Sequence, residues 1–86
     1  MFYFYVLKSM KDRELYFGSS SDLRQRLSDH NAGKSLATRA RRPLRLVYYE
    51  AYASKSDALA RERQMKSYGK AYAQLKRRLI RSIQEA

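Results

Sequence analysis

The sequence FYFYVLKSMKDRELYFGSS at residues 2–20 decides the fold. It opens with an uninterrupted aromatic and aliphatic run at 2–7, which indicates a strand covered on both faces. A short polar stretch separates this run from a second one at 15–19. So short a connection predicts an antiparallel hairpin, in which Tyr5 and Tyr16 are approximate cross-strand neighbours.

A helix is expected directly after the hairpin. Ser20 or Ser21 is predicted to cap its start, with Asp22 in the first turn, where the helix dipole favours negative charge. The helix is predicted to end near Asn31, because Gly33 is suited to the left-handed conformation that terminates helices.

A third strand and two more helices complete the chain. The stretch 44–50 is rich in Leu, Val and Tyr and predicts the strand. Ser54 and Asp57 resemble a capping box that opens a second helix, which Gly69 ends. A last helix over 70–84 has apolar residues at helical spacing. The predicted class is α+β, a small three-stranded antiparallel sheet flanked by helices in the order β-β-α-β-α-α.

The composition is that of one small, strongly basic domain over residues 1–86. Nineteen Lys and Arg oppose eight Asp and Glu, which gives a formal net charge of +11. The chain has no cysteine, which excludes a disulfide framework and a Cys-based metal site and fits a cytoplasmic protein. No apolar run is long enough to span a bilayer, so no membrane partner is expected.

The positive charge is concentrated in two blocks. Residues 34–45 hold five basic and no acidic residues, and residues 61–81 hold eight basic residues opposed only by Glu62. Two such blocks suit a groove that follows phosphates, so nucleic acid is the expected partner. An anionic membrane surface and simple solubility are the other interpretations of the charge. The candidate nucleic-acid contacts are Lys34, Arg39, Arg41, Arg42, Lys66 and Lys70.

Four residues of the first predicted helix share one face: Leu23, Arg26, Leu27 and His30. Because the leucines must face the sheet, Arg26 and His30 are expected at the edge of that face. They either complete the border of the core or belong to a functional site.

The second predicted helix carries a carboxylate in its apolar stripe. Glu62 lies about one turn from Ala58 and Leu59 on one side and from Met65 on the other. A carboxylate in such a place needs a cation. That cation is either a nearby arginine or a hard divalent ion such as Mg²⁺, and charge alone does not choose between them.

Two phenols, an arginine, an imidazole and a carboxylate can form a metal-assisted site that cleaves phosphodiester bonds. Phenol or imidazole deprotonates water, arginine neutralises developing charge, and a metal stabilises the leaving oxygen. Tyr5 and Tyr16 are equally compatible with a packing role, with their hydroxyl groups hydrogen-bonded.

The tripeptides Tyr3-Phe4-Tyr5 and Tyr16-Phe17-Gly18 resemble the two signatures of the GIY-YIG endonuclease superfamily. The resemblance covers nearly the whole chain and is strongest to short bacterial members, which are similar to the nuclease domain of the excision-repair incision subunit. The first tripeptide lacks the glycine of the family. Further matching residues are Asp22, Leu23, Arg26, Leu27, His30, Asn31, Gly33, Thr38, Pro43, Leu46, Val47, Tyr48, Glu50, Ala58, Glu62 and Lys66.

The resemblance implies a role for each of five polar residues. It makes Tyr5 and Tyr16 the catalytic tyrosines. It makes Arg26 the contact to phosphate and His30 the helper of the general base. Glu62 becomes the ligand of Mg²⁺ or Mn²⁺. Members of the family often add a late asparagine near the site, whereas here no asparagine follows position 31 and Gln84 is a weak substitute.

The implied function is a metal-dependent endonuclease that acts on nucleic acid, with DNA as the expected substrate and repair or recombination as the expected setting. The alternative is a non-catalytic nucleic-acid-binding module on the same fold. Such a module would need none of Tyr5, His30 or Glu62, so their joint presence favours the enzyme. A ribosome-associated or membrane-surface protein ranks third. One small domain offers little surface for recognition, which is compatible with a homodimer or a partner protein.

Overall fold

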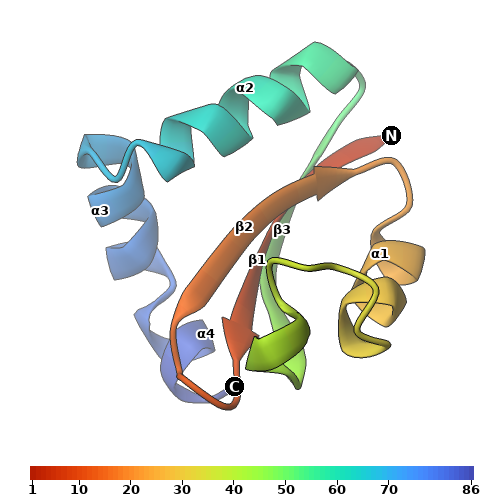
Figure 1. The fold of residues 1–86 in the computed structure, drawn as a ribbon. Helices are drawn as coiled ribbons and strands as arrows, with labels where there is room; N and C mark the ends of the chain where they lie inside the picture. The colour runs from red at the N-terminus through yellow and green to blue at the C-terminus, as the bar shows by residue number, and fades with distance from the viewer.

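Three antiparallel strands form the sheet in the order β2-β1-β3 in the computed structural model, which describes residues 1–86 (Figure 1). They are β1 (Phe2–Ser9), β2 (Leu15–Ser20) and β3 (Leu44–Tyr52). The strand β1 is central because β2 pairs with one of its edges and β3 with the other. The predicted α+β class, the hairpin and the order of elements are confirmed.

Helices cover both faces of this sheet. On one face lie α2 (Lys55–Lys66), α3 (Lys70–Arg78) and α4 (Ile80–Gln84), while α1 (Leu23–Asn31) lies on the other (Figure 1). A short 3₁₀ turn, η1 (Arg39–Arg41), belongs to the segment between α1 and β3. None of the helices is long and apolar enough to cross a membrane.

The alternation of side chains along β1 divides the core into two clusters. Phe4 and Val6 point toward α2 and α3 and pack with Phe17, Met65, Leu75 and Leu79. Tyr5 and Leu7 point toward α1, where Leu44, Leu23 and Leu27 surround them. A strand buried on both faces explains the continuous apolar run with which the sequence opens.

The cap of α1 differs from the prediction. Asp22 is the N-cap residue, and its carboxylate accepts a hydrogen bond from the backbone N–H of Gln25. The predicted caps, Ser20 or Ser21, are therefore wrong by one or two positions, and the Ser20 hydroxyl donates to the Asp22 carbonyl instead. The predicted end of the helix is confirmed, since Gly33 follows it with a φ of +79°.

The later helices also depart from the prediction in two places. Ser54 is the N-cap of α2, but its side chain makes no capping hydrogen bond, so the predicted capping box does not form. The single helix predicted over 70–84 is wrong, because the helix is interrupted at Leu79 (φ −102°, ψ 11°). Leu79 is buried in the core at this bend. Beyond it, the carbonyl of Ile83 accepts a hydrogen bond of 2.5 Å from the ammonium of Lys8.

Candidate active site

The phenol of Tyr5 lies buried between the sheet and α1. Its ring leans toward β2, where Gly18 is the paired residue. A methyl group at position 18 would lie 2.5 Å from the Cζ atom of Tyr5, too close for any side chain larger than hydrogen. The glycine of the second tripeptide therefore makes room for the tyrosine of the first.

His30 is fully buried and both of its ring nitrogens are hydrogen-bonded. Nε2 lies 2.9 Å from the hydroxyl of Tyr5, and Nδ1 lies 2.6 Å from Oγ1 of Thr38. Burial, together with the positive charge of Arg26, lowers the pKa of His30 below its ordinary value. The imidazole is therefore neutral at neutral pH, with one nitrogen donating and the other accepting.

Thr38 is a partner that the sequence did not reveal. It lies in the segment between α1 and β3 and is fully buried beside His30. In the sequence it stood out only as one residue of the family resemblance. Segments of irregular structure have no periodicity, so nothing in the pattern predicts which side chain turns inward.

Tyr16 completes a cluster with Tyr5 and His30. The strand register pairs Tyr16 with Leu7. The two tyrosines are therefore diagonal neighbours on one face, which agrees with the approximate cross-strand contact expected from the sequence. Its ring meets the imidazole edge to face with centroids 5.3 Å apart. His30 thus contacts both tyrosines of the hairpin.

Arg26 lies one turn before His30 on α1 and is half-buried. Burial raises the pKa of Tyr5, and the guanidinium of Arg26 opposes this rise without cancelling it. The phenol of Tyr5 is therefore protonated at neutral pH. Arg26 forms no ion pair with a carboxylate, so its charge is available to an anion.

Glu62 reaches the edge strand β2 from α2, on the other side of the sheet. Its Oε1 accepts a hydrogen bond of 2.5 Å from the Ser19 hydroxyl, and its Oε2 lies 2.6 Å from Nζ of Lys66. That ammonium also lies 5.9 Å from the centroid of the Tyr16 ring. The cation that neutralises Glu62 is thus a lysine rather than an arginine, and it links the carboxylate to the tyrosine cluster.

The apolar stripe beside Glu62 is narrower than predicted. Ala58 and Met65 are buried, whereas Leu59 is 37% exposed. The side chain of Glu62 itself is 19% exposed. It therefore lies at the border of the core and can meet a ligand from solvent.

A second carboxylate, Glu50 of β3, holds the same helix at the opposite edge of the sheet. It receives Nε and Nη2 of Arg61, with 3.0 Å between Nε and Oε1, and the hydroxyl groups of Tyr48 and Tyr52. Burial alone would raise the pKa of Glu50, but the bonds from Tyr52, Arg61 and Tyr48 hold it below its ordinary value. Glu50 is therefore a saturated anion with no capacity left for a ligand.

Arg41, one of the candidate contacts to nucleic acid, is committed to the fold. Its Nε donates to Oδ2 of Asp12 at 2.7 Å, and its Nη2 donates to the Leu15 carbonyl. The hydrogen bond from Arg41 is the largest cause that lowers the pKa of Asp12 to about 2. Arg41 therefore connects residues 34–45, called the basic segment below, to the hairpin of β1 and β2.

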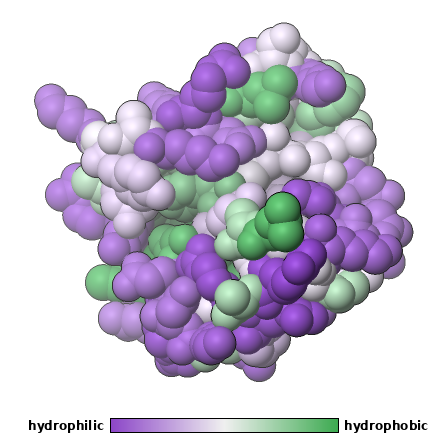
Figure 2. Space-filling view, in the orientation of Figure 1, coloured by the Kyte–Doolittle hydropathy of each residue, from purple (hydrophilic) through white to green (hydrophobic).

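The remaining candidates are exposed to solvent. Lys34 is 68% exposed beside Asp29, while Arg39 and Arg42 each use only Nε, for a backbone carbonyl. Lys70 begins α3 on the surface. Hydrophilic residues cover most of the face shown in Figure 2, with small hydrophobic areas among them. The charged groups of Lys34, Arg39, Arg42 and Lys70 therefore lie at the surface of the protein.

This fold and cluster define a class of small α+β domains in which two hairpin tyrosines meet a histidine from the following helix. The chain belongs to the GIY-YIG catalytic domain family, whose sequence pattern it matches over residues 1–79. The predicted resemblance is confirmed.

Small proteins from bacteria are among its relatives. The UPF0213 protein of Bacillus pumilus is 48% identical over 67 residues, which cover 77% of this chain and 67% of the relative. The UPF0213 protein of Staphylococcus haemolyticus is 42% identical over 69 residues, which cover 79% and 83%. The solution NMR structure of a UPF0213 protein from Bacillus halodurans is similar, with a TM-score of 0.52, 34% identity and coverage of 87% of this chain and 81% of that one.

Proposed function

We propose that the protein is a divalent-metal-dependent endonuclease that hydrolyses phosphodiester bonds in nucleic acid, with DNA as substrate, in repair or recombination. The observation that carries the proposal is the buried chain of hydrogen bonds from Tyr5 through His30 to Thr38. A buried, neutral imidazole bonded to a phenol is an arrangement that can accept and pass a proton.

Proton transfer follows from the two pKa shifts. Because Tyr5 is protonated at neutral pH, it needs a partner before its oxygen can take a proton from water. Nε2 of neutral His30 lies 2.9 Å from that oxygen and can receive the phenolic proton. In the proposed step, Tyr5 passes its proton to His30 as the attacking water gives one to Tyr5. In this proposal Nδ1 of His30 carries the ring proton and donates it to Oγ1 of Thr38, which leaves Nε2 to accept.

Arg26 and Tyr16 act on the phosphate in this proposal. The guanidinium of Arg26 makes no ion pair and opposes the rise that burial causes in the pKa of Tyr5, which supports a role in neutralising charge that develops on a phosphate beside this phenol. Tyr16 also contacts the ring of His30 edge to face, and it lies on the edge strand β2. Its role is to position the water or the phosphate.

Glu62 fits a hard cation such as Mg²⁺ or Mn²⁺. Mg²⁺ is often bound by only one or two carboxylates and keeps several of its waters, and the chain has no group of three or more acidic or histidine ligands. The carboxylate already attracts one cation, the ammonium of Lys66. When bound, the metal would stabilise the leaving oxygen. Lys66 would have to move aside to admit it.

The alternative is a module that binds nucleic acid without cutting it. A panel of duplex, flap and branched DNAs, each incubated with Mg²⁺ or with EDTA, separates the two functions. We expect cleavage that needs Mg²⁺, and we expect Glu62→Gln to abolish cleavage while gel-shift affinity persists or rises. Binding of every substrate without any cleavage would favour the module. A Gln variant that cuts at the wild-type rate would refute the metal-ligand role.

A further inference from the structure

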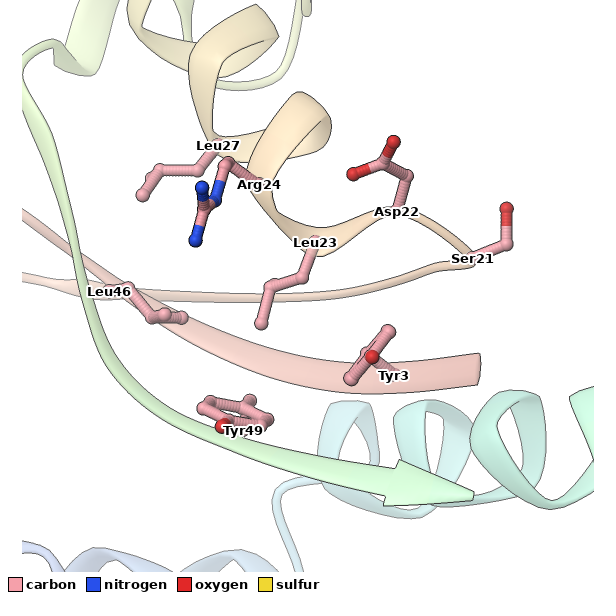
Figure 3. Close-up of a pocket in the computed structure, with 8 residues that line it drawn as sticks. All are labelled: Tyr3, Ser21, Asp22, Leu23, Arg24, Leu27, Leu46 and Tyr49. Atoms are coloured by element: carbon pink, nitrogen blue, oxygen red, sulfur yellow. The ribbon is translucent and has the colours of Figure 1, made fainter. Parts of the chain in front are cut away.

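A groove lies on the same face of the sheet as Tyr5 and is formed by side chains that the proposed chemistry does not use (Figure 3). It has a volume of about 450 Å³, within the range of small-molecule sites. The helix α1 forms its wall and the strands β1 and β3 form its floor. The residues that define it are Tyr3, Tyr49, Leu23, Leu27, Leu46 and Arg24.

Two tyrosines give the groove its shape. The rings of Tyr3 and Tyr49 meet edge to face, with centroids 5.9 Å apart and planes inclined by 67°. Tyr49 is 52% exposed although it lies in the sheet. Two rings at a steep angle, one of them open to solvent, form a corner in which a third flat ring can stack.

The groove adjoins the proposed catalytic phenol. The strand register pairs Tyr49 of β3 directly with Tyr5 of β1, so their Cα atoms are about 5 Å apart. The ring of Tyr5 leans the other way, toward Gly18, whereas Tyr49 lines the groove. One strand of nucleic acid could therefore occupy the groove and the tyrosine cluster with neighbouring nucleotides.

The charge of the groove suits the same occupant. The side chain of Arg24 points from α1 toward Leu46 and Tyr49 (Figure 3), and no carboxylate pairs with it. The one acid at the border, Asp22, already accepts the N–H of Gln25 as the helix cap. An open aromatic ring beside a free guanidinium complements a nucleobase and its phosphate.

We propose that this groove holds an unpaired nucleobase of a DNA strand, stacked on Tyr49, with Arg24 at the adjoining phosphate. The proposal rests on the nuclease function and names its substrate class, which is DNA with an unpaired nucleotide next to the bond that is cut. A base inside a duplex is already stacked and paired, so fully paired DNA would have to expel a base before it could fill the groove.

The test measures binding in EDTA, so that it does not depend on cleavage. Fluorescence anisotropy compares a single DNA strand with the same strand carrying abasic residues at its centre. Wild type should bind the strand with bases about ten-fold more tightly, as expected for one stacked base. Tyr49→Ala should remove this difference, whereas Tyr49→Phe, which keeps the ring, should retain it. Equal binding of both strands by wild type would overturn the proposal.

The arginine has a matched control in Arg77, an exposed arginine of α3 outside the groove. Both Arg24→Ala and Arg77→Ala remove one positive charge, so both should weaken DNA binding in general. Only Arg24→Ala should also lower the ratio of the affinity for DNA with an unpaired nucleotide to the affinity for fully paired DNA. An equal fall of that ratio in the two variants would exclude Arg24 from the groove's function.

Two other occupants would appear in the same experiments. If the loss of affinity on removing bases is larger for a single RNA strand than for the DNA strand, the assignment to DNA is overturned. A wild-type dimer in gel filtration that Tyr49→Ala converts to a monomer would show that a second copy fills the groove. If binding depends on the bases but no DNA is cleaved in Mg²⁺, the nuclease function is wrong and the base-binding groove stands. If DNA is cleaved but binding does not depend on the bases, only the proposed role of the groove is wrong.

Discussion

Arg61 of α2 and Glu50 of β3 form a two-pronged ion pair at one edge of the sheet, with 3.0 Å between Nε and Oε1. The next residue of the helix, Glu62, reaches Ser19 of β2 at the opposite edge. Two adjacent residues thus fasten α2 across the whole width of the sheet. The position of the proposed metal ligand depends on a carboxylate that no metal or substrate needs to touch.

Glu50→Gln should therefore impair cleavage through position alone. The change weakens hydrogen bonds to a charged group, which should cost about 1–3 kcal/mol in the free energy of unfolding. The cleavage rate at saturating DNA should fall while DNA affinity is unchanged. Gln64→Ala is the control, because it removes the other partner of Arg61 and leaves Glu50 in place. A destabilised Gln variant with wild-type single-turnover cleavage would contradict the positioning role.

The two tyrosines should respond differently in stability and alike in activity. Tyr5→Phe removes the hydrogen bond to His30 and should cost about 1 kcal/mol, whereas the hydroxyl of Tyr16 has no partner in the protein and its loss should cost almost nothing. Both variants should remain folded and lose most cleavage. Thermal melting and cleavage assays on the same samples check this. Full activity in both would show that the tyrosines only pack.

Acid should inhibit and destabilise the protein through His30. The pKa of His30 is lower in the folded protein than the 6.5 expected for the unfolded chain. Between these two pKa values, the unfolded chain binds more protons than the folded one. Stability should therefore fall as the pH drops through 6.5, and cleavage should fall with a midpoint below 6.5. The contribution of Glu50, whose pKa is lowered from 4.5, is lost only at more acidic pH. Denaturant unfolding at a series of pH values measures this loss. In His30→Gln, the free energy of unfolding should no longer fall as the pH drops through 6.5.

Lys66→Gln should lower the Mg²⁺ concentration needed for half-maximal cleavage. The hydrogen bond to Glu62 raises the pKa of Lys66, so the lysine is a cation at neutral pH and competes for the carboxylate. Lys70→Gln is the matched control, since it removes the same charge from a residue that has no ion pair with Glu62. Magnesium titrations at saturating DNA measure the effect. An equal shift in both variants would mean that overall charge, rather than competition, governs metal binding.

Arg41 and Arg42 should separate the stability of the basic segment from its binding. Arg42→Ala should weaken DNA binding equally for all sequences and reduce the slope of affinity against salt by about one ion. Arg41→Ala should mainly destabilise the fold, because it leaves Asp12 without its partner. Salt-dependent anisotropy and thermal melting distinguish the two. A loss in Arg42→Ala confined to one DNA sequence would indicate base reading instead.

The sheet and the tyrosine cluster could be predicted because local patterns determine them. The apolar run of β1, the polar turn and β2 fix the hairpin, and the period of α1 places His30 over it. The exact register, in which Tyr16 pairs with Leu7 and Tyr5 with Gly18, was not predictable, because the length of a turn does not fix which residues pair. The break at Leu79 was not predictable either, since residues 75, 79 and 83 keep helical spacing on both sides of it.

Contacts between remote segments could not be predicted. Ser19 and Glu62 are 43 residues apart, and only the packing of α2 against β2 brings them together. The commitment of Arg41 to Asp12 has the same origin. A block of basic residues in a sequence shows how many cations a segment holds. It does not show which of them form ion pairs within the fold.

The bond between Thr38 and His30 joins the basic segment to the tyrosine cluster. Lys34, Arg39 and Arg42 lie in the same segment as Thr38, so a ligand that shifts the segment also shifts the partner of the imidazole. Affinity and imidazole orientation are then thermodynamically linked, and the linkage is reciprocal. If binding of a phosphate backbone strengthens the bond between Thr38 and His30, that bond in turn strengthens binding by the same factor. Thr38→Val, which removes the bond, should then bind the phosphate backbone more weakly by that factor.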